Sequence, residues 1–197
     1  MAKFVAISGT SRPDNFTHRA LGVVCQALRK RGVELEVFDA RSMTLSFPGS
    51  PATDDAKRLE DAVREATAVV LATPEYHGSF SAMTKLILEN MGFPSALKSK
   101  PVALVGVAQG RIGAIKSLEQ LRGVCSHMGA IVVPQAVSIA GVQTAFEGDE
   151  LVDQAVRRAL EGSAEALFQF VQSYVCPKYE LEAMVRGETT SAWTSNV

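Results

Sequence analysis

The amino-acid sequence predicts an α/β protein of three layers, α/β/α, with helices on both faces of a five-stranded parallel sheet. Strand-like and helix-like segments alternate along the chain, the order produced by parallel strands joined through crossover helices. Most of the strand-like segments are apolar throughout, as expected of strands buried on both faces. The chain has 197 residues, a length at which a single domain buries roughly 70% of its unfolded surface. One globular domain is therefore the first expectation.

The first half of the chain predicts two strands, each followed by a helix. Residues 3–8 form a nearly continuous apolar run, and residues 17–31 then carry apolar side chains at helical spacing until Gly32. Residues 33–37 alternate apolar and polar, which is typical of a strand with one partly exposed face. A helix fits over residues 54–66.

The second half predicts three more strands and sets their order in the sheet. Apolar runs indicate strands at residues 68–73, 101–108 and 130–133. Helical spacing indicates helices at residues 80–91, 112–128 and 150–174. The alternating second strand fits an edge, and the first, third and fourth strands fit the interior, which favours the order 2-1-3-4-5 of a flavodoxin-like fold. Ligands of such sheets bind beyond the carboxyl ends of the first and third strands. We therefore expect the loops at residues 9–17, 73–79 and 108–113 to form the binding site.

Charge and cysteine content exclude several classes of function. The 20 Lys and Arg residues nearly balance the 21 Asp and Glu residues, so we expect no nucleic-acid or membrane partner. Cys25, Cys125 and Cys176 are too widely spaced for a disulfide framework or a metal site. The N-terminus has no signal-peptide pattern, and no apolar stretch approaches the ~20 residues of a membrane span. We therefore expect a cytoplasmic protein.

The first loop is rich in hydrogen-bond donors and runs directly into a helix. Ser11, Arg12, Asn15 and Thr17 place hydroxyls, an amide and a guanidinium beside a helix N-terminus, which together suit a phosphate group. The alternative is a plain turn in which these polar residues cap the helix. The sequence has neither a Walker motif nor a G-x-G-x-x-G after the first strand, which argues against nucleotide hydrolysis and a standard dinucleotide site.

The second loop contains Pro74, Glu75, Tyr76 and His77, followed by Gly78. Pro and Gly shape a turn whose backbone amides can face outward, and the two rings offer flat polar surfaces, so the loop suits the edge of a planar heterocycle. An ordinary loop histidine, or acid–base catalysis by Glu75 and His77, are the alternatives.

The third loop contains Gln109, Gly110 and Arg111. Its glycine allows a ligand to approach the backbone closely. Arg111 either attracts an anionic cosubstrate or is simply solvated. We predict no catalytic side chain of the triad type in any of the three loops.

These loops resemble those of the NADPH-dependent FMN reductase family, which includes flavin, quinone, azo and chromate reductases. The resemblance spans roughly residues 3–135 and is carried by Gly-Thr-Ser-Arg at 9–12, Thr-Pro-Glu-Tyr-His-Gly-Ser at 73–79 and Gly-Arg-Ile-Gly at 110–113. It implies a flavodoxin-like fold, bound FMN, NADPH or NADH as electron donor, and a homodimer or homotetramer. The domain would cover residues 1–175, and residues 176–197 would be a tail that is disordered or contacts a partner subunit.

The resemblance also implies roles for individual residues. Ser11, Arg12, Asn15 and Thr17 would hold the FMN phosphate. Pro74, Glu75, Tyr76 and His77 would line the isoalloxazine ring, and Gln109, Gly110 and Arg111 would face its pyrimidine end. Asn15 stands where the family usually has Ser, and His77 where Asn is common.

Three functions follow as hypotheses. The first is an FMN-dependent NAD(P)H oxidoreductase that passes electrons to a small-molecule acceptor such as a free flavin, a quinone, an azo compound or a metal oxyanion. The second is a flavodoxin-type electron carrier without NAD(P)H activity, against which the near-zero net charge argues. The third is a phosphate-binding module without redox activity.

Overall fold

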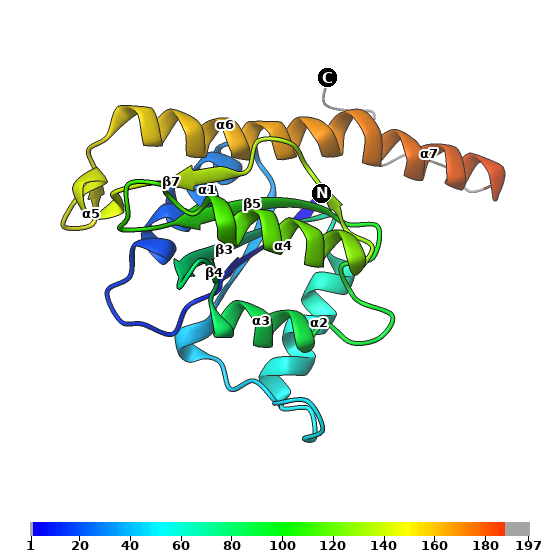
Figure 1. The fold of residues 1–197 in the computed structure, drawn as a ribbon. Helices are drawn as coiled ribbons and strands as arrows, with labels where there is room; N and C mark the ends of the chain where they lie inside the picture. The colour runs from blue at the N-terminus through cyan, green and yellow to red at the C-terminus, as the bar shows by residue number, and fades with distance from the viewer. Residues whose placement is uncertain (1, 188–197) are drawn as a thin grey trace.

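The computed structural model describes residues 2–187, and Figure 1 shows a parallel sheet between two layers of helices. The strands are β1 (Lys3–Ser8), β2 (Glu34–Asp39), β3 (Ala68–Tyr76), β4 (Ser79–Phe80), β5 (Pro101–Val107), β6 (Ile131–Val132), β7 (Val137–Ile139), β8 (Phe146–Glu147) and β9 (Glu150–Leu151). The α-helices are α1 (Phe16–Lys30), α2 (Asp54–Glu65), α3 (Ala82–Glu89), α4 (Ile115–His127), α5 (Val142–Ala145), α6 (Gln154–Phe170) and α7 (Cys176–Val185). A short 3₁₀ turn, Ala40–Ser42, follows β2.

The central strands are apolar throughout because each faces two cores. In β1, Phe4 and Ala6 belong to the core shared with α1 and α6, whereas Val5 and Ile7 belong to the core shared with α2, α3 and α4. Successive side chains of a strand point to opposite faces, so a strand covered on both sides needs an apolar residue at every position. Figure 1 shows α6 lying across one face of the sheet and α2 and α3 on the other.

The sheet has the order β2-β1-β3-β5-β6, which confirms the predicted flavodoxin-like order 2-1-3-4-5. The partly exposed β2 is the edge strand, as its alternating sequence predicts. The pairs β1–β2, β1–β3 and β3–β5 are all parallel. Their carboxyl ends therefore lie along one edge of the sheet.

The predicted fifth strand at residues 130–133 is only half of the observed one. β6 pairs with Pro101 and Val102 at the start of β5, and β7 pairs with the end of β5. Pro134 lacks a backbone N–H and Gln135 has a φ of +68°, so the chain leaves the ladder between the two pieces. The sheet also contains one antiparallel strand that the sequence does not predict, β4 beside β3.

The predicted helices at 80–91, 112–128 and 150–174 begin too early. Residues 79–80 form β4, and residues 150–151 form β9, so α3 and α6 start only after these hairpins. The α4 helix begins only at Ile115, because Gly113 has a φ of +78°, outside the helical range.

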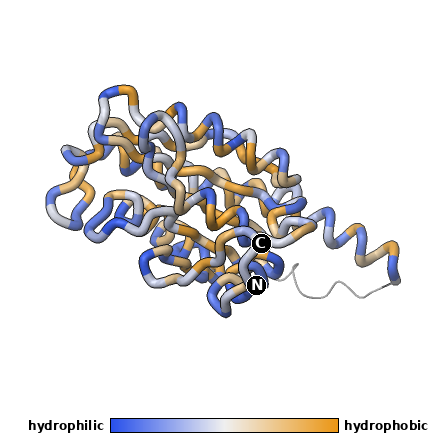
Figure 2. Tube along the Cα trace, turned by 60° about the horizontal axis from the view of Figure 1, so that its bottom comes forward, coloured by the Kyte–Doolittle hydropathy of each residue, from blue (hydrophilic) through white to orange (hydrophobic). Residues whose placement is uncertain are grey.

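The C-terminal helix is longer than predicted. A π-helical turn, Val171–Val175, joins α6 to α7, and the helix continues to Val185. In Figure 1 α7 projects beyond the body, and Figure 2 shows hydrophobic segments along it. The boundary between a domain at 1–175 and a tail at 176–197 stays a prediction, and residues 188–197 lie outside the described part of the chain. Among residues 2–187, no helix has the length and apolar character needed to cross a membrane.

Replacing Gly162 in α6 with alanine is expected to raise the free energy of unfolding by about 0.5–1 kcal/mol. A β-carbon at this exposed helical position would meet nothing within 4 Å. The substitution removes backbone freedom from the unfolded chain and creates no contact. Urea unfolding followed by circular dichroism measures the change, and a loss of stability would contradict the prediction.

Candidate functional site

A pocket of about 550 Å³ lies at the carboxyl ends of β1, β3 and β5. Its walls come from the loop before α1, the segment 74–78, the loop between β5 and α4, and Val142 of α5. This is the edge where the direction of winding reverses between β1 and β3, the usual ligand position in an open α/β sheet.

The pocket brings together almost all of the site residues predicted from the sequence. The lining residues include Arg12, Asn15, Thr17, Pro74, Glu75, Tyr76, His77, Gln109, Gly110 and Arg111. Ser11 is the exception, because it is exposed and is not part of the pocket wall. Pro13, Asp14, Ile112 and Gly113 complete the loops on either side.

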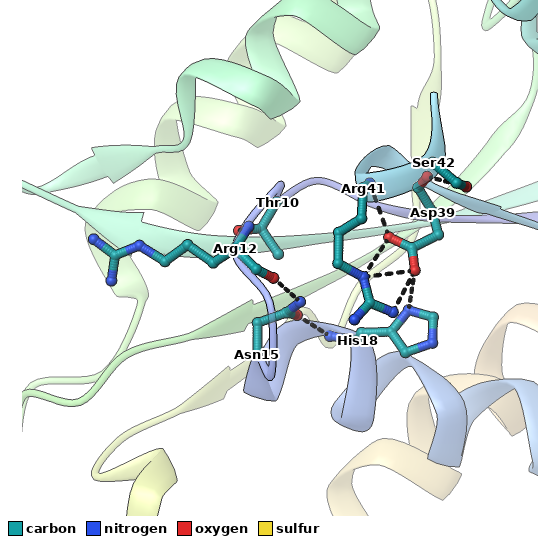
Figure 3. A network of polar contacts seen from close by, with 7 residues as sticks. All are labelled: Thr10, Arg12, Asn15, His18, Asp39, Arg41 and Ser42. Carbon is teal, nitrogen blue, oxygen red and sulfur yellow. Dashed lines mark hydrogen bonds and ion pairs between the residues drawn. The ribbon is translucent and has the colours of Figure 1, made fainter. Parts of the chain in front are cut away.

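Asn15 shapes the first loop. Its Oδ1 accepts a hydrogen bond from the backbone N–H of His18 at 2.7 Å, and its Nδ2 donates to the carbonyl oxygen of Arg12 at 2.7 Å (Figure 3). Asn15 is thus the N-cap of α1, as the capping alternative predicts. The cap fixes the curvature of the loop and leaves the first turn of α1 facing the pocket through Phe16 and Thr17.

Arg12 is the arginine that the first loop contributes to the pocket wall. Its guanidinium lies 4.6 Å above the centre of the Tyr76 ring, and within residues 2–187 it has no carboxylate partner. Figure 3 shows its side chain pointing away from Asp39 and Arg41. A guanidinium without a carboxylate partner remains available to an anionic ligand.

Thr10 connects the first and second loops, a role that the sequence does not reveal. Its side chain is buried, and its Oγ1 accepts a hydrogen bond from the backbone N–H of Arg12 at 3.3 Å. The same oxygen lies 3.5 Å from the hydroxyl of Tyr76. The position of the Tyr76 ring is therefore linked to the backbone that carries Arg12.

Arg41, unlike Arg12, is held by a carboxylate. Its Nε and Nη2 donate to Asp39 Oδ2 at 2.8 and 2.5 Å, and His18 Nδ1 lies 3.5 Å from the same oxygen (Figure 3). Burial disfavours the charged form of Asp39, but the hydrogen bonds from Arg41 outweigh it, so the pKa of Asp39 lies below its usual value of 3.8. Asp39 is therefore part of a structural ion pair.

Replacing Asp39 with asparagine is expected to lower the free energy of unfolding by about 1 kcal/mol at pH 7, because the pair is only partly buried and is screened by solvent. A carboxyl whose pKa is lowered by folding adds stability above its unfolded pKa and loses that contribution as the pH falls through its folded pKa. The difference between the two proteins should therefore shrink below about pH 4.

Urea unfolding between pH 7 and pH 3.5 tests this prediction, with Asp61→Asn on the exposed face of α2 as control. A difference that persists unchanged at the lowest pH would contradict it.

A tight hairpin forms the second wall of the pocket. β3 runs to Tyr76, and β4 returns from Ser79 after two turn residues. His77 and Gly78 have φ values of +52° and +75°, the left-handed pair of a type I′ turn. Asn usually precedes Gly in such turns. Because His77 stands in that place, the sequence lacks the usual signal of a hairpin.

Glu75 is engaged by α4. Its Oε2 accepts a hydrogen bond from the backbone N–H of Ser117 at 3.0 Å, in the first turn of the helix. A carboxylate at this position also interacts favourably with the helix dipole. The geometry therefore favours a structural role for this side chain over acid–base catalysis.

A buried group of hydroxyls joins the first loop to the second. Thr84 Oγ1 donates to the carbonyl oxygen of Gly9 at 3.0 Å and lies 2.9 Å from Thr73 Oγ1. Ser81 Oγ also hydrogen bonds the Gly9 carbonyl, and Ser81 N donates to Thr73 Oγ1 at 3.2 Å. Nothing in the sequence identifies this cluster, because its members come from separate elements.

The third loop is held by hydrogen bonds within itself and to β7 and the segment that follows β7. The N–H groups of Gly113 and Gly141 both donate to the carbonyl oxygen of Gly110 at 3.2 Å. Ser138 Oγ accepts from Ala114 N at 2.9 Å. A β-carbon at Gly110 would meet nothing within 4 Å, so no neighbouring side chain packs against this glycine, which lines the pocket.

Comparison with known proteins gives a family match over most of the chain. The model of the NADPH-dependent FMN reductase family matches residues 2–144. The chain belongs to this family. The match confirms the resemblance predicted from the loop motifs and favours the reductase over the electron-carrier alternative.

Curated relatives from the family are reductases. The chain is 28% identical over 158 residues to the NADH:(hydroxy)cinnamate reductase subunit CrdA of Vibrio ruber, covering 77% of this chain and 78% of that protein. It is 27% identical over 144 residues to an FMN-dependent NADPH-azoreductase of Staphylococcus aureus, covering 69% of this chain and 76% of that protein.

Solved structures share the fold. FerB, a flavoenzyme NAD(P)H:acceptor oxidoreductase from Paracoccus denitrificans, matches with a TM-score of 0.71 and 23% identity, covering 88% of this chain and 99% of that chain. The apo form of the NADH:FMN oxidoreductase EMOB matches with a TM-score of 0.68 and 21% identity, covering 85% and 90%. A flavodoxin from the Archaea matches with a TM-score of 0.59 and 12% identity, covering 87% and 99%.

Membership of the FMN reductase family makes the chain an FMN-dependent NAD(P)H oxidoreductase that transfers electrons to a second, small-molecule acceptor. Its pocket suits FMN in three respects. The volume lies within the ~300–1,000 Å³ range of small-molecule sites, the first turn of α1 meets the wall, and Arg12 supplies a cation without a carboxylate partner in residues 2–187.

Proposed function

We propose that this pocket binds FMN and that NADPH or NADH and the electron acceptor use it in turn. The carrying observation is that the predicted phosphate and ring residues, Ser11 excepted, line one pocket at the carboxyl edge of the sheet. FMN at this position supplies the chemistry of accepting a hydride and passing electrons on. The acceptor class comprises free flavins, quinones, azo compounds and metal oxyanions.

The first loop would hold the phosphate. Arg12 offers up to two parallel hydrogen bonds to phosphate oxygens, and Thr17 adds a hydroxyl beside the N–H groups of the first turn of α1. Asn15 would act chiefly as the cap that keeps the loop curved, since both ends of its amide are already hydrogen bonded. Ser11 would need a small movement of the loop to reach the same group.

The second and third loops would orient the ring. Tyr76 and the His77–Gly78 turn line one wall, and Gln109, Gly110 and Arg111 line the other. Fixed N–H dipoles stabilise negative charge that develops on a reduced ring without needing to reorganise. Electron transfer through FMN requires no nucleophilic side chain, because the protein needs only to bind and orient the nucleotide donor and the electron acceptor.

Titration of the purified protein with FMN, followed by anaerobic addition of NADPH or NADH, tests the proposal. We expect quenching of FMN fluorescence on binding, loss of the visible flavin absorbance on addition of the nucleotide, and its return when a quinone is added. Protein that takes up no FMN would overturn the site assignment, and protein that binds FMN but stays yellow would instead support an electron carrier.

We propose further that the protein is a homodimer or homotetramer in the cytoplasm. The α7 helix contributes no buried residue to its own chain, and Leu181, Met184 and Val185 are exposed on it, which supports a subunit contact. Cys25, Cys125 and Cys176 are free thiols, which is the state expected in a reducing compartment. Sedimentation velocity at several protein concentrations measures the assembly.

A further inference from the structure

Two residues in the first half of α4, Ser117 and Gln120, fasten the hairpin that forms one wall of the pocket. Gln120 Nε2 donates to the carbonyl oxygen of Gly78 at 3.0 Å, and Gln120 Oε1 accepts from the hydroxyl of Ser79 at 2.7 Å. Three residues earlier in the same helix, Ser117 N donates to Glu75 Oε2 at 3.0 Å. The first half of α4 is therefore bonded to both strands of the hairpin, to Glu75 of β3 and to Ser79 of β4.

The hairpin depends on such support. Its second strand, β4, has two residues, and its turn places His77 and Gly78 in the left-handed region. Hairpins this short are marginally stable on their own in water. The β3–β4 pairing ends at Tyr76 and Ser79, so the turn itself lies beyond the ladder.

Gln120 holds the turn from outside the pocket. It is exposed and is not part of the pocket wall. Its two hydrogen bonds reach the second turn residue, Gly78, and the adjacent Ser79, and both turn residues, His77 and Gly78, line the pocket. Any effect on a bound ring must therefore pass through the direction and rigidity of the turn.

We propose that Gln120 is a positioning residue that sets the direction of the His77–Gly78 amides and thereby tunes the reduction potential of bound FMN. This inference rests on the proposed function of the pocket. Preorganised N–H groups stabilise a charged reduced ring more than a neutral oxidised one. Loosening the turn should thus weaken binding of the reduced cofactor more than binding of the oxidised cofactor.

Gln120→Leu tests the proposal, because leucine keeps a similar bulk and removes both hydrogen bonds. We expect the affinity for oxidised FMN to fall a few-fold and the affinity for reduced FMN to fall about ten-fold more. This ten-fold difference corresponds to a reduction potential about 30 mV more negative for a two-electron couple. Glu119→Gln, the neighbouring exposed residue of α4, is the matched control and should leave the potential unchanged. Dye-equilibrium titration gives the potential, and fluorescence quenching gives the affinity for oxidised FMN.

Ser79→Ala reaches the same contact from the hairpin. It should lower the potential by a smaller amount and should have no further effect when Gln120 is already leucine, since the two residues then act through one bond. If Gln120 had only a structural role, its loss would reduce the affinities for oxidised and reduced FMN equally and leave the reduction potential of bound FMN unchanged.

The outcomes distinguish failure of FMN binding by the pocket from failure of the positioning role of Gln120. Wild-type protein that binds no FMN overturns the proposed function together with this inference. Wild-type protein that binds FMN, while Gln120→Leu has the potential of Glu119→Gln, overturns the positioning role alone. Additive effects of Ser79→Ala and Gln120→Leu would also overturn it.

Discussion

Replacing Arg12 with alanine is expected to weaken FMN binding by about 30- to 100-fold, which corresponds to about 2–3 kcal/mol. Charge-assisted hydrogen bonds to phosphate are stronger than neutral ones, and Arg12 lines the pocket from the loop that precedes α1. Stability without ligand should change little, since the guanidinium is exposed and contacts only the Tyr76 ring among described residues. Fluorescence quenching by the protein measures the affinity.

Arg41→Ala is the matched control for this prediction. Arg41 lies on the same side of the sheet but is hydrogen bonded to Asp39, so its loss should reduce stability and leave FMN affinity nearly unchanged. Riboflavin, which lacks the phosphate, gives a second control: Arg12→Ala should bind riboflavin as well as the wild type does. An equal loss of affinity for riboflavin and FMN would show that Arg12 acts on the ring and not on the phosphate.

Replacing Gly9 with alanine is expected to lower the free energy of unfolding by about 3 kcal/mol. A β-carbon at this position would lie 2.1 Å from Thr84 Oγ1 and 2.9 Å from the carbonyl oxygen of Ala72. The backbone cannot retreat easily, because Gly9 N donates to that same carbonyl at 2.8 Å and the Gly9 carbonyl accepts from Thr84. The change would therefore break the buried hydroxyl cluster beneath the pocket.

Chemical unfolding of the ligand-free protein measures this loss. Gly162→Ala, at a glycine with open space around it, should move stability in the opposite direction. Thr84→Ala should partly relieve the Gly9→Ala defect by removing the atom that clashes. A Gly9→Ala protein as stable as the wild type would show that the loop accommodates the methyl group by shifting.

The sequence predicts best the features that repeat along the chain. The continuous apolar runs of β1, β3 and β5 result from burial on both faces, and the alternation in β2 results from its place at the edge. These periodicities were sufficient for the order of the sheet and for the position of the pocket. Loop composition then indicated candidate residues that, except for Ser11, all line the pocket, because donors and glycines concentrate where strands end.

Features that depend on single contacts were not predictable. The β4 hairpin carries His where Asn usually marks the turn, and the break between β6 and β7 depends on the conformation of Gln135. The hydrogen bond of Thr84 to Gly9 and that of Gln120 to Gly78 join elements far apart in the chain. Hydroxyls and amides of this kind look like ordinary surface residues until the fold brings their partners close.

The continuous helix from α6 through α7 has a practical consequence. The α6 helix starts near the pocket edge, after α5, and runs to the opposite edge of the sheet (Figure 1). Residues 154–175 span ~33 Å at the rise of a helix. An electrode, bead or fusion partner coupled at Gly187 of a single subunit would therefore be tethered on the side of the sheet remote from the pocket.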